Sequence, residues 1–276
     1  MMRYLKLTNF ELSRFFKIYL VLIGVTFVMQ LLGVVFTSNK YLSAIKELLE
    51  SGMTQEEALK QWGPFSFYNV TSSFWFFAPV ALCAASLIIY VLFIWYRDWF
   101  GKNTFAYRLL MLPTARINVY FAKATAIFLM VLGLISLQIA FLPIESHLLQ
   151  SIVPAPYLEE QGINQMISSF DSLRILYPTT FIEYLTHYGV GLMAVLVVFT
   201  GVLFERCFRW KGILLGVLFA GISLIVFFLP VIIQEFVLVQ FFYPTELFFL
   251  MVLTGLIVMT GSILMSNYLL NKKIRV

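Results

Sequence analysis

The sequence predicts an all-α integral membrane protein with six transmembrane helices. Of its 276 residues, 61% are hydrophobic and only 12% are charged, whereas ordinary soluble domains are roughly 25% charged. The apolar residues gather in six almost uncharged runs, each close to the roughly 20 residues that a helix needs to cross a bilayer. Because these runs recur along the whole chain and leave little of it for a separate soluble domain, we expect a single transmembrane domain over residues 1–276.

The six runs predict the spans and the connections between them. The expected spans cover residues 18–36, 74–96, 119–141, 184–204, 213–233 and 247–270. We expect large loops on one side at 37–73 and 142–183, a tight basic turn at 205–211 and an apolar re-entrant or interfacial hairpin at 234–246. Short helices are expected in the first large loop, where Thr54 and Glu57 have the spacing of a capping box.

The segment before the first span alternates apolar and charged residues. This pattern favours an N-terminal elbow helix on the membrane surface, capped by Thr8 or Asn9. The alternative is that these residues are only the polar flank of span one. No small-residue cleavage site follows the first apolar run, so we expect that run to remain as a span rather than a cleaved signal.

Basic residues place both termini on the cytoplasmic side. All but four of the 19 Lys and Arg residues flank the termini and the connections after spans two and four. The exceptions are Lys40, Lys46, Lys60 and Arg174. By the positive-inside rule, the large loops are extracellular. The basic residues therefore flank the inner leaflet, which argues against nucleic-acid binding despite the net charge of +5.

The connection at residues 97–118 is the most unusual stretch of the chain. It is too charged to cross a bilayer and too apolar for a solvated loop. A short helix from about Thr104 to Leu112 would end at Pro113, because proline supplies no amide hydrogen. Just inside the next span, Lys123 is expected to snorkel back to the headgroups.

Motifs for catalysis are missing from the sequence. The only histidines, His147 and His187, are far apart and do not form the HExxH pattern of a metalloprotease. No GxxxxGK[ST] phosphate loop is present, so the chain cannot hydrolyse ATP by that chemistry. We expect no enzymatic activity of its own, no cofactor and no metal site.

Sequence detail within the 97–118 connection and just after it resembles ABC-2 type transporter permeases. The resemblance is carried by Phe100–Asn103, Tyr107–Arg116 and Tyr120–Lys123, which are similar to a family segment of the form "GK...Y..LMLP.SR...Y.AK". The chain has Thr114-Ala115-Arg116 where family members often have a Ser-Arg or Thr-Arg pair. Within the family, it looks most like the antibiotic-peptide and envelope-stress permeases of Gram-positive bacteria.

The resemblance implies that the chain is one subunit of an ATP-driven exporter in a bacterial cell membrane. Its partners would be two copies of a separate ATP-binding cassette subunit, a second permease copy or paralogue, and membrane lipid. The 97–118 connection would be the coupling helix that docks into the ATPase. The expected contact residues are Gly101, Lys102, Asn103, Arg108, Leu109, Met111 and Arg116.

Three alternatives stay open at this point. The 97–118 connection could be a basic interfacial helix that only anchors spans two and three. The chain could be a partner-free secondary transporter or channel, although such proteins usually carry ionisable residues near the midplane and internal repeats. A membrane enzyme is the third. The Phe-rich spans favour an amphipathic or apolar substrate, such as a peptide, an antibiotic or a lipid-linked molecule.

Overall fold

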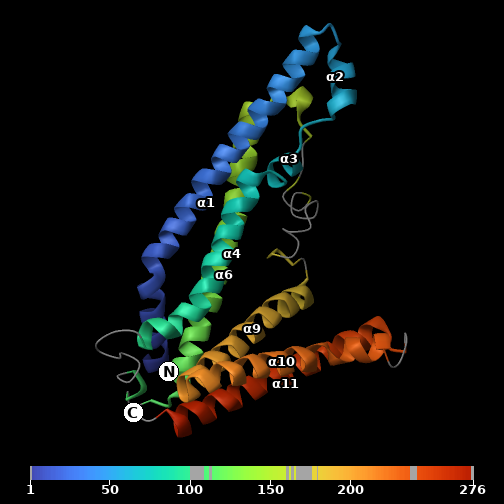
Figure 1. Ribbon diagram of the computed structural model, residues 1–276. Helices are drawn as coiled ribbons and strands as arrows, with labels where there is room; N and C mark the ends of the chain where they lie inside the picture. Colours follow the sequence, from blue (N-terminus) through green and yellow to red (C-terminus); the bar gives the residue numbers. More distant parts are fainter. Residues whose placement is uncertain are drawn as a thin grey trace. The chain divides into compact units, whose positions relative to one another are not determined.

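The computed structural model describes residues 2–99, 109–111, 114–159, 162, 165, 176–178, 180–236 and 241–274. In these ranges the chain is helical apart from short connections, and its one β-bridge pairs Phe65 with Leu158. Six helices are long and apolar enough to cross a membrane (Figure 1). The chain therefore has the architecture of a multi-pass membrane protein.

The helices fold into two compact units. Unit 1 comprises Met1–Ser13, Leu87–Leu129 and Thr180–Val276. Unit 2 comprises Arg14–Ser86 and Met130–Thr179. Three long helices, α1 (Met2–Glu50), α4 (Phe74–Trp99) and α6 (Ile117–Ile152), contribute residues to both units.

Helix α1 runs without interruption from Met2 to Glu50. Its 49 residues correspond to a length of about 74 Å at 1.5 Å per residue, more than twice the roughly 30 Å of bilayer hydrocarbon. The expected elbow is therefore not a separate helix. Thr8 does not cap a helix start, because its Oγ1 donates to the Tyr4 carbonyl one turn earlier at 3.2 Å.

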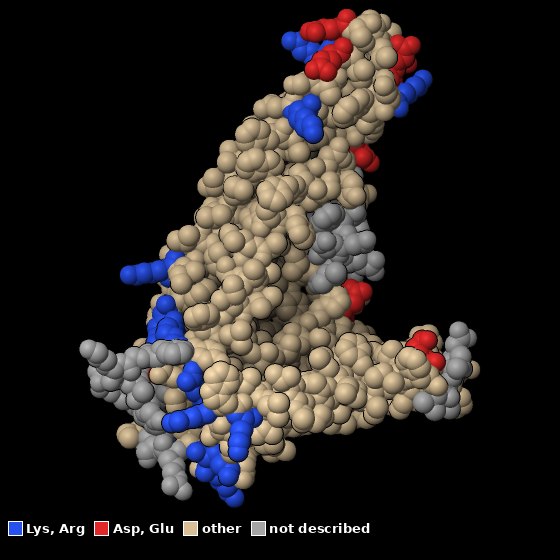
Figure 2. Space-filling view, viewed as in Figure 1, with Lys and Arg blue, Asp and Glu red and all other residues tan. Residues whose placement is uncertain are grey.

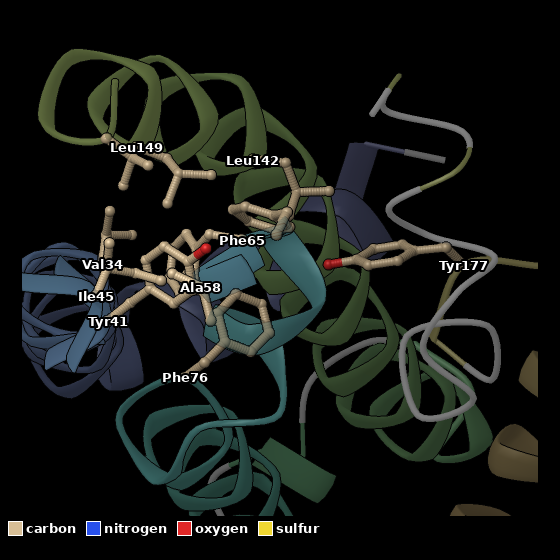
Figure 3. Close-up of a cluster of buried hydrophobic side chains, with 12 residues drawn as sticks. Val34, Tyr41, Ile45, Ala58, Phe65, Phe76, Leu142, Leu149 and Tyr177 are labelled. Atoms are coloured by element: carbon tan, nitrogen blue, oxygen red, sulfur yellow. The ribbon is translucent and has the colours of Figure 1, made fainter. Parts of the chain in front are cut away.

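Unit 2 is built around an aromatic and aliphatic core. The short helices α2 (Gln55–Trp62) and α3 (Phe67–Thr71) and the 3-10 turn η1 (Ala155–Tyr157) lie in this unit. Figure 3 shows the core, in which Tyr41 of α1 lies near Phe65, with ring centroids 4.8 Å apart. The members of the cluster are Val34, Tyr41, Ile45, Ala58, Phe65, Phe67, Val70, Phe76, Leu142, Leu149, Val153 and Tyr177. The first large connection is thus a packed structure, and the return bond of the predicted capping box is present from the Thr54 amide to Glu57 at 2.8 Å.

Helices α1 and α6 pack in register within unit 2. The side-chain amides of Gln30 and Gln138 donate to each other, at 3.0 and 3.1 Å. Both residues are buried. Because each amide satisfies the other, two polar side chains can lie inside this apolar helix pair.

Unit 1 contains a tightly packed group of helices: α9 (Phe181–Phe208), α10 (Trp210–Phe236) and α11 (Pro244–Tyr268), followed by a π-helical turn η2 (Leu269–Lys273). The predicted tight turn is confirmed, since only Arg209 separates α9 from α10 and it has a positive φ of 52°. A Cβ on Gly216 would lie 3.0 Å from the Gly201 carbonyl oxygen. Glycine at this position therefore lets α10 approach the backbone of α9.

The α10–α11 pair carries opposite charges at its two ends (Figure 2). Lys211 lies in the first turn of α10 and Lys272 in η2, where the two antiparallel helices meet. Glu235 is near the end of α10 and Glu246 is in the first turn of α11. Basic and acidic residues are therefore segregated along this helix pair.

The first five predicted spans each lie inside one of the long helices and are shorter than the helix that contains them. The sixth lies in α11 except for residues 269–270, which belong to η2. Helix α1 continues to Glu50 and α6 to Ile152, so the loops expected at 37–73 and 142–183 begin later than predicted. Residues 234–236 complete α10 instead of starting a hairpin. Residues 237–240 of that expected hairpin lie outside the described residues.

Candidate functional site

A group of four charged side chains, three of them buried and the fourth partly exposed, lies in unit 1 beside the two ends of the 97–118 connection. We call Glu11, Arg97, Asp98 and Lys123 the ion cluster. Glu11 comes from the first part of α1, Arg97 and Asp98 from the last turn of α4, and Lys123 from the second turn of α6. The ion cluster therefore joins three helices around the connection.

Lys123 is the centre of the ion cluster and is only 1% exposed. Its Nζ donates to Glu11 Oε1 at 2.7 Å, to Asp98 Oδ2 at 2.5 Å and to the carbonyl of Ile94 at 3.1 Å. An ammonium group has three donors, so each hydrogen has an acceptor. This arrangement corrects the expectation that Lys123 snorkels to the headgroups: its side chain points into the protein, where two carboxylates offset the loss of hydration.

Arg97 balances the second negative charge of the ion cluster. Its Nη2 donates to Glu11 Oε2 at 3.2 Å and to the Tyr90 hydroxyl at 3.2 Å. Glu11 thus uses one carboxylate oxygen for each cation. Two carboxylates and two cations give no net charge, which is the condition under which charged groups can be buried without a large penalty.

Aromatic rings cover the apolar side of the ion cluster. The Trp95 ring centroid is 5.3 Å from Lys123 Nζ, and the Tyr90 ring centroid is 5.5 Å from the Arg97 guanidinium carbon. Both distances are within the range of cation–π attraction. Trp95 also packs edge-on against Phe199 of α9. The low polarity of these surroundings strengthens the ion pairs that they enclose.

A second contact fixes the end of the connection to the C-terminal part of the chain. Arg116 Nη1 donates to the carbonyls of Leu270 and Ile274, at 2.7 and 3.0 Å. Carbonyls at a helix C-terminus have no partner within the helix and carry partial negative charge, so a guanidinium is well suited to them. Arg116 was expected to contact a partner subunit, and in the chain alone its Nη1 binds the end of η2.

A third contact joins the start of the connection to the end of α9. The Tyr96 hydroxyl donates to the Glu205 carboxylate. The guanidinium carbon of Arg206 lies 4.7 Å from the Tyr96 ring centroid and 5.7 Å from that of Trp99. Tyr96 and Trp99 therefore contact the charged residues in the last turn of α9.

The other expected contact residues are only partly described. Leu109 is buried, with 6% of its surface exposed, whereas Met111 is 67% exposed. Residues 109–110 are helical and Met111 lies in a turn, within the stretch expected to form the coupling helix. Gly101, Lys102, Asn103 and Arg108 lie outside the described residues.

The described side chains of this site connect helices to one another. Within the described ranges, no group of three or more His, Cys, Asp or Glu side chains is placed to hold a metal ion. The charged groups of the ion cluster bind one another and link α1, α4 and α6. Comparison with protein-family models, with curated proteins and with solved structures finds no match to this chain.

Proposed function

We propose that this chain is the membrane-spanning permease subunit of an ATP-driven transporter of the ABC-2 type. The 97–118 connection is the surface on which a separate ATP-binding subunit docks. The chain lies in a bacterial cell membrane with both termini in the cytoplasm, and the functional complex contains two ATP-binding subunits and a second permease copy or paralogue. Its substrate is an amphipathic or apolar molecule that the complex exports.

One observation carries the proposal: the 97–118 connection is bound at both ends to helices that are distant in sequence. Arg97 and Asp98 are its first two residues and bind residues of α1 and α6. Arg116, near its end, binds carbonyls at the C-terminal end of the chain. A displacement of the connection by an ATPase would therefore be transmitted to several spans at once, which is what a coupling element must do.

The surface of the connection also fits a docking role. Met111 presents a large apolar side chain that is 67% exposed, on a segment that the sequence makes strongly basic. The basic end of the α10–α11 pair supports placing this side in the cytoplasm, because Lys and Arg are enriched in cytoplasmic connections. An exposed apolar residue among cations is suited to a cleft on a soluble, acidic partner.

The docking step is tested by co-purification with the ATP-binding subunit encoded beside this chain. We expect Met111→Asp to reduce both complex formation and stimulation of the ATPase, because the change places a charge on the docking surface. Met53→Asp is the matched control, since Met53 is also exposed but lies in unit 2. Unchanged assembly and ATPase stimulation by Met111→Asp would contradict the docking proposal.

Force transfer is tested separately from docking. We expect Glu11→Gln to leave the ATP-binding subunit bound but to lower substrate-stimulated ATPase activity, because Glu11 is the residue through which α1 joins the ion cluster. Transport by this chain alone in lipid vesicles, with no ATP-binding subunit present, would favour a partner-free transporter or channel instead.

A further inference from the structure

A buried carboxylate outside the ion cluster, Glu145, lies in unit 2, and no cation in the described part of the chain pairs with it. It belongs to α6, one turn after Leu142 and one turn before Leu149, both of which are in the core cluster (Figure 3). Glu145 is 1% exposed, and neither of its carboxylate oxygens has a hydrogen-bond partner. It therefore differs from Glu11, which is equally buried but is bound to two cations.

The register between α1 and α6 identifies the residue at the level of Glu145. Gln30 is paired with Gln138, and two turns further along both helices the positions are Ser38 and Glu145. Ser38 is fully buried, and its Oγ also lacks a hydrogen-bond partner. Two unsatisfied polar groups therefore occupy corresponding positions on neighbouring helices.

Among the residues of unit 2 that the structure describes, no cation is placed to neutralise Glu145. The titratable groups of the core cluster are the hydroxyls of Tyr41, which donates to the Gly63 carbonyl at 2.8 Å, and of Tyr177. The charged residues on the described elements of this unit are exposed, except Arg14 and Glu145 itself. Arg14 lies at the N-terminal end of the part of α1 that belongs to unit 2, far along the helix from the level of Glu145. The exposed residues are Lys17, Lys40, Lys46, Glu47, Glu50, Glu56, Glu57, Lys60 and Glu159, and His147 is exposed as well.

An ionised carboxylate in this position is energetically unfavourable. Removing a charge from water without a counter-ion or hydrogen bonds costs at least several kcal/mol, and buried acids then stay neutral. We propose that Glu145 is a proton-binding site: the folded protein holds this side chain as the neutral acid. This inference does not depend on the proposed transport function.

Proton binding by Glu145 makes the stability of the fold depend on pH. In the unfolded chain an ordinary glutamate titrates near pH 4.3 and is ionised above about pH 5. The folded state holds one proton more than the unfolded state above that pH, so stability falls as pH rises. One proton changes the unfolding equilibrium constant by up to about tenfold per pH unit.

The test is the thermal unfolding midpoint of the full chain in detergent between pH 5 and pH 8. The wild-type midpoint should fall with rising pH. Glu145→Gln should remove most of this slope and raise the midpoint at pH 8, because the amide is neutral at every pH. Glu47→Gln is the control, since Glu47 is exposed on α1 in the same unit, and it should keep the wild-type slope.

Infrared spectroscopy provides a second measurement that needs no variant. At pH 7 in heavy water the wild-type protein should show the carbonyl stretch of a protonated carboxylic acid, because exposed carboxylates are ionised at that pH. Absence of this band would overturn the proposal, as would equal pH slopes for wild type and Glu145→Gln. A midpoint at pH 8 that rises with sodium or potassium concentration in the wild type but not in Glu145→Gln would assign the site to a metal cation and would also overturn it.

Discussion

Replacing Lys123 by methionine is the most direct test of the ion cluster. Methionine keeps the length of the apolar stem and removes the ammonium group. Glu11 would retain Arg97, but Asp98 would lose the cation at 2.5 Å. Both carboxylate side chains are at most 3% exposed, so solvent cannot readily replace the lost partner.

The expected loss of stability is about 3–5 kcal/mol, the range found when one member of a buried ion pair is removed. Lys46→Met is the matched control, because Lys46 pairs with Glu50 at 3.8 Å while their side chains are 77% and 68% exposed. That exposed pair should contribute no more than about 0.5 kcal/mol. The two variants should therefore differ by at least about seventyfold in the unfolding equilibrium constant.

The assay is denaturant-induced unfolding of the purified chain in mixed micelles, followed by far-ultraviolet circular dichroism. The double variant Lys123→Met with Asp98→Asn should recover part of the loss, because the remaining carboxylate, Glu11, still pairs with Arg97. If Lys123→Met is within about 1 kcal/mol of Lys46→Met, a difference typical of surface substitutions, the cluster does not hold unit 1 together. Failure of the double variant to recover any stability would refute the charge-balance argument.

Three further changes test other contacts. Arg116→Ala should speed hydrogen exchange at residues 269–274 and lower stability by about 1–3 kcal/mol, because two carbonyls lose a charged donor; an unchanged exchange rate there would count against this contact. Gly216→Ala should lower the thermal unfolding midpoint by forcing α10 away from α9, whereas Gly221→Ala, with nothing within 4 Å of its added Cβ, should leave it unchanged or raise it; equal effects would contradict the close approach. Replacing Gln30 and Gln138 together by leucine should destabilise the protein by less than the sum of the two single replacements, with a coupling energy of about 0.6–1.7 kcal/mol in a double-mutant cycle. Additive effects of the two replacements would argue against the amide pair.

The number and order of the spans could be predicted from the sequence because a bilayer imposes a simple rule on composition. Each apolar run had to be helical to satisfy its backbone in lipid, and each lies in a long helix. Helix ends could not be predicted in the same way. Hydropathy shows where a segment stops being apolar, but it does not show where the helix ends. Helix α1 continues to Glu50 through polar residues, which form helices as readily as apolar residues do.

The ion cluster could not be assembled from the sequence, although each member was visible in it. Lys123 pairs with Glu11 over 112 residues and Arg97 pairs with Glu11 over 86. No periodicity connects residues at such separations. The available signal was a lysine one turn inside a span, with an acidic residue near the end of two other spans. Snorkelling to the headgroups and pairing with a carboxylate both explain a lysine at that depth. Only the packing of α1, α4 and α6 distinguishes between these two explanations.

The amide pair between Gln30 and Gln138 constrains the order of assembly during synthesis of the chain. The two residues are 108 positions apart. At a synthesis rate of about 5–20 residues per second, Gln30 emerges about 5–20 s before its partner exists. During that interval the first span must reside in the membrane or its insertion machinery with an unsatisfied amide. Assembly of the α1–α6 pair therefore has to wait for the third span to be synthesised.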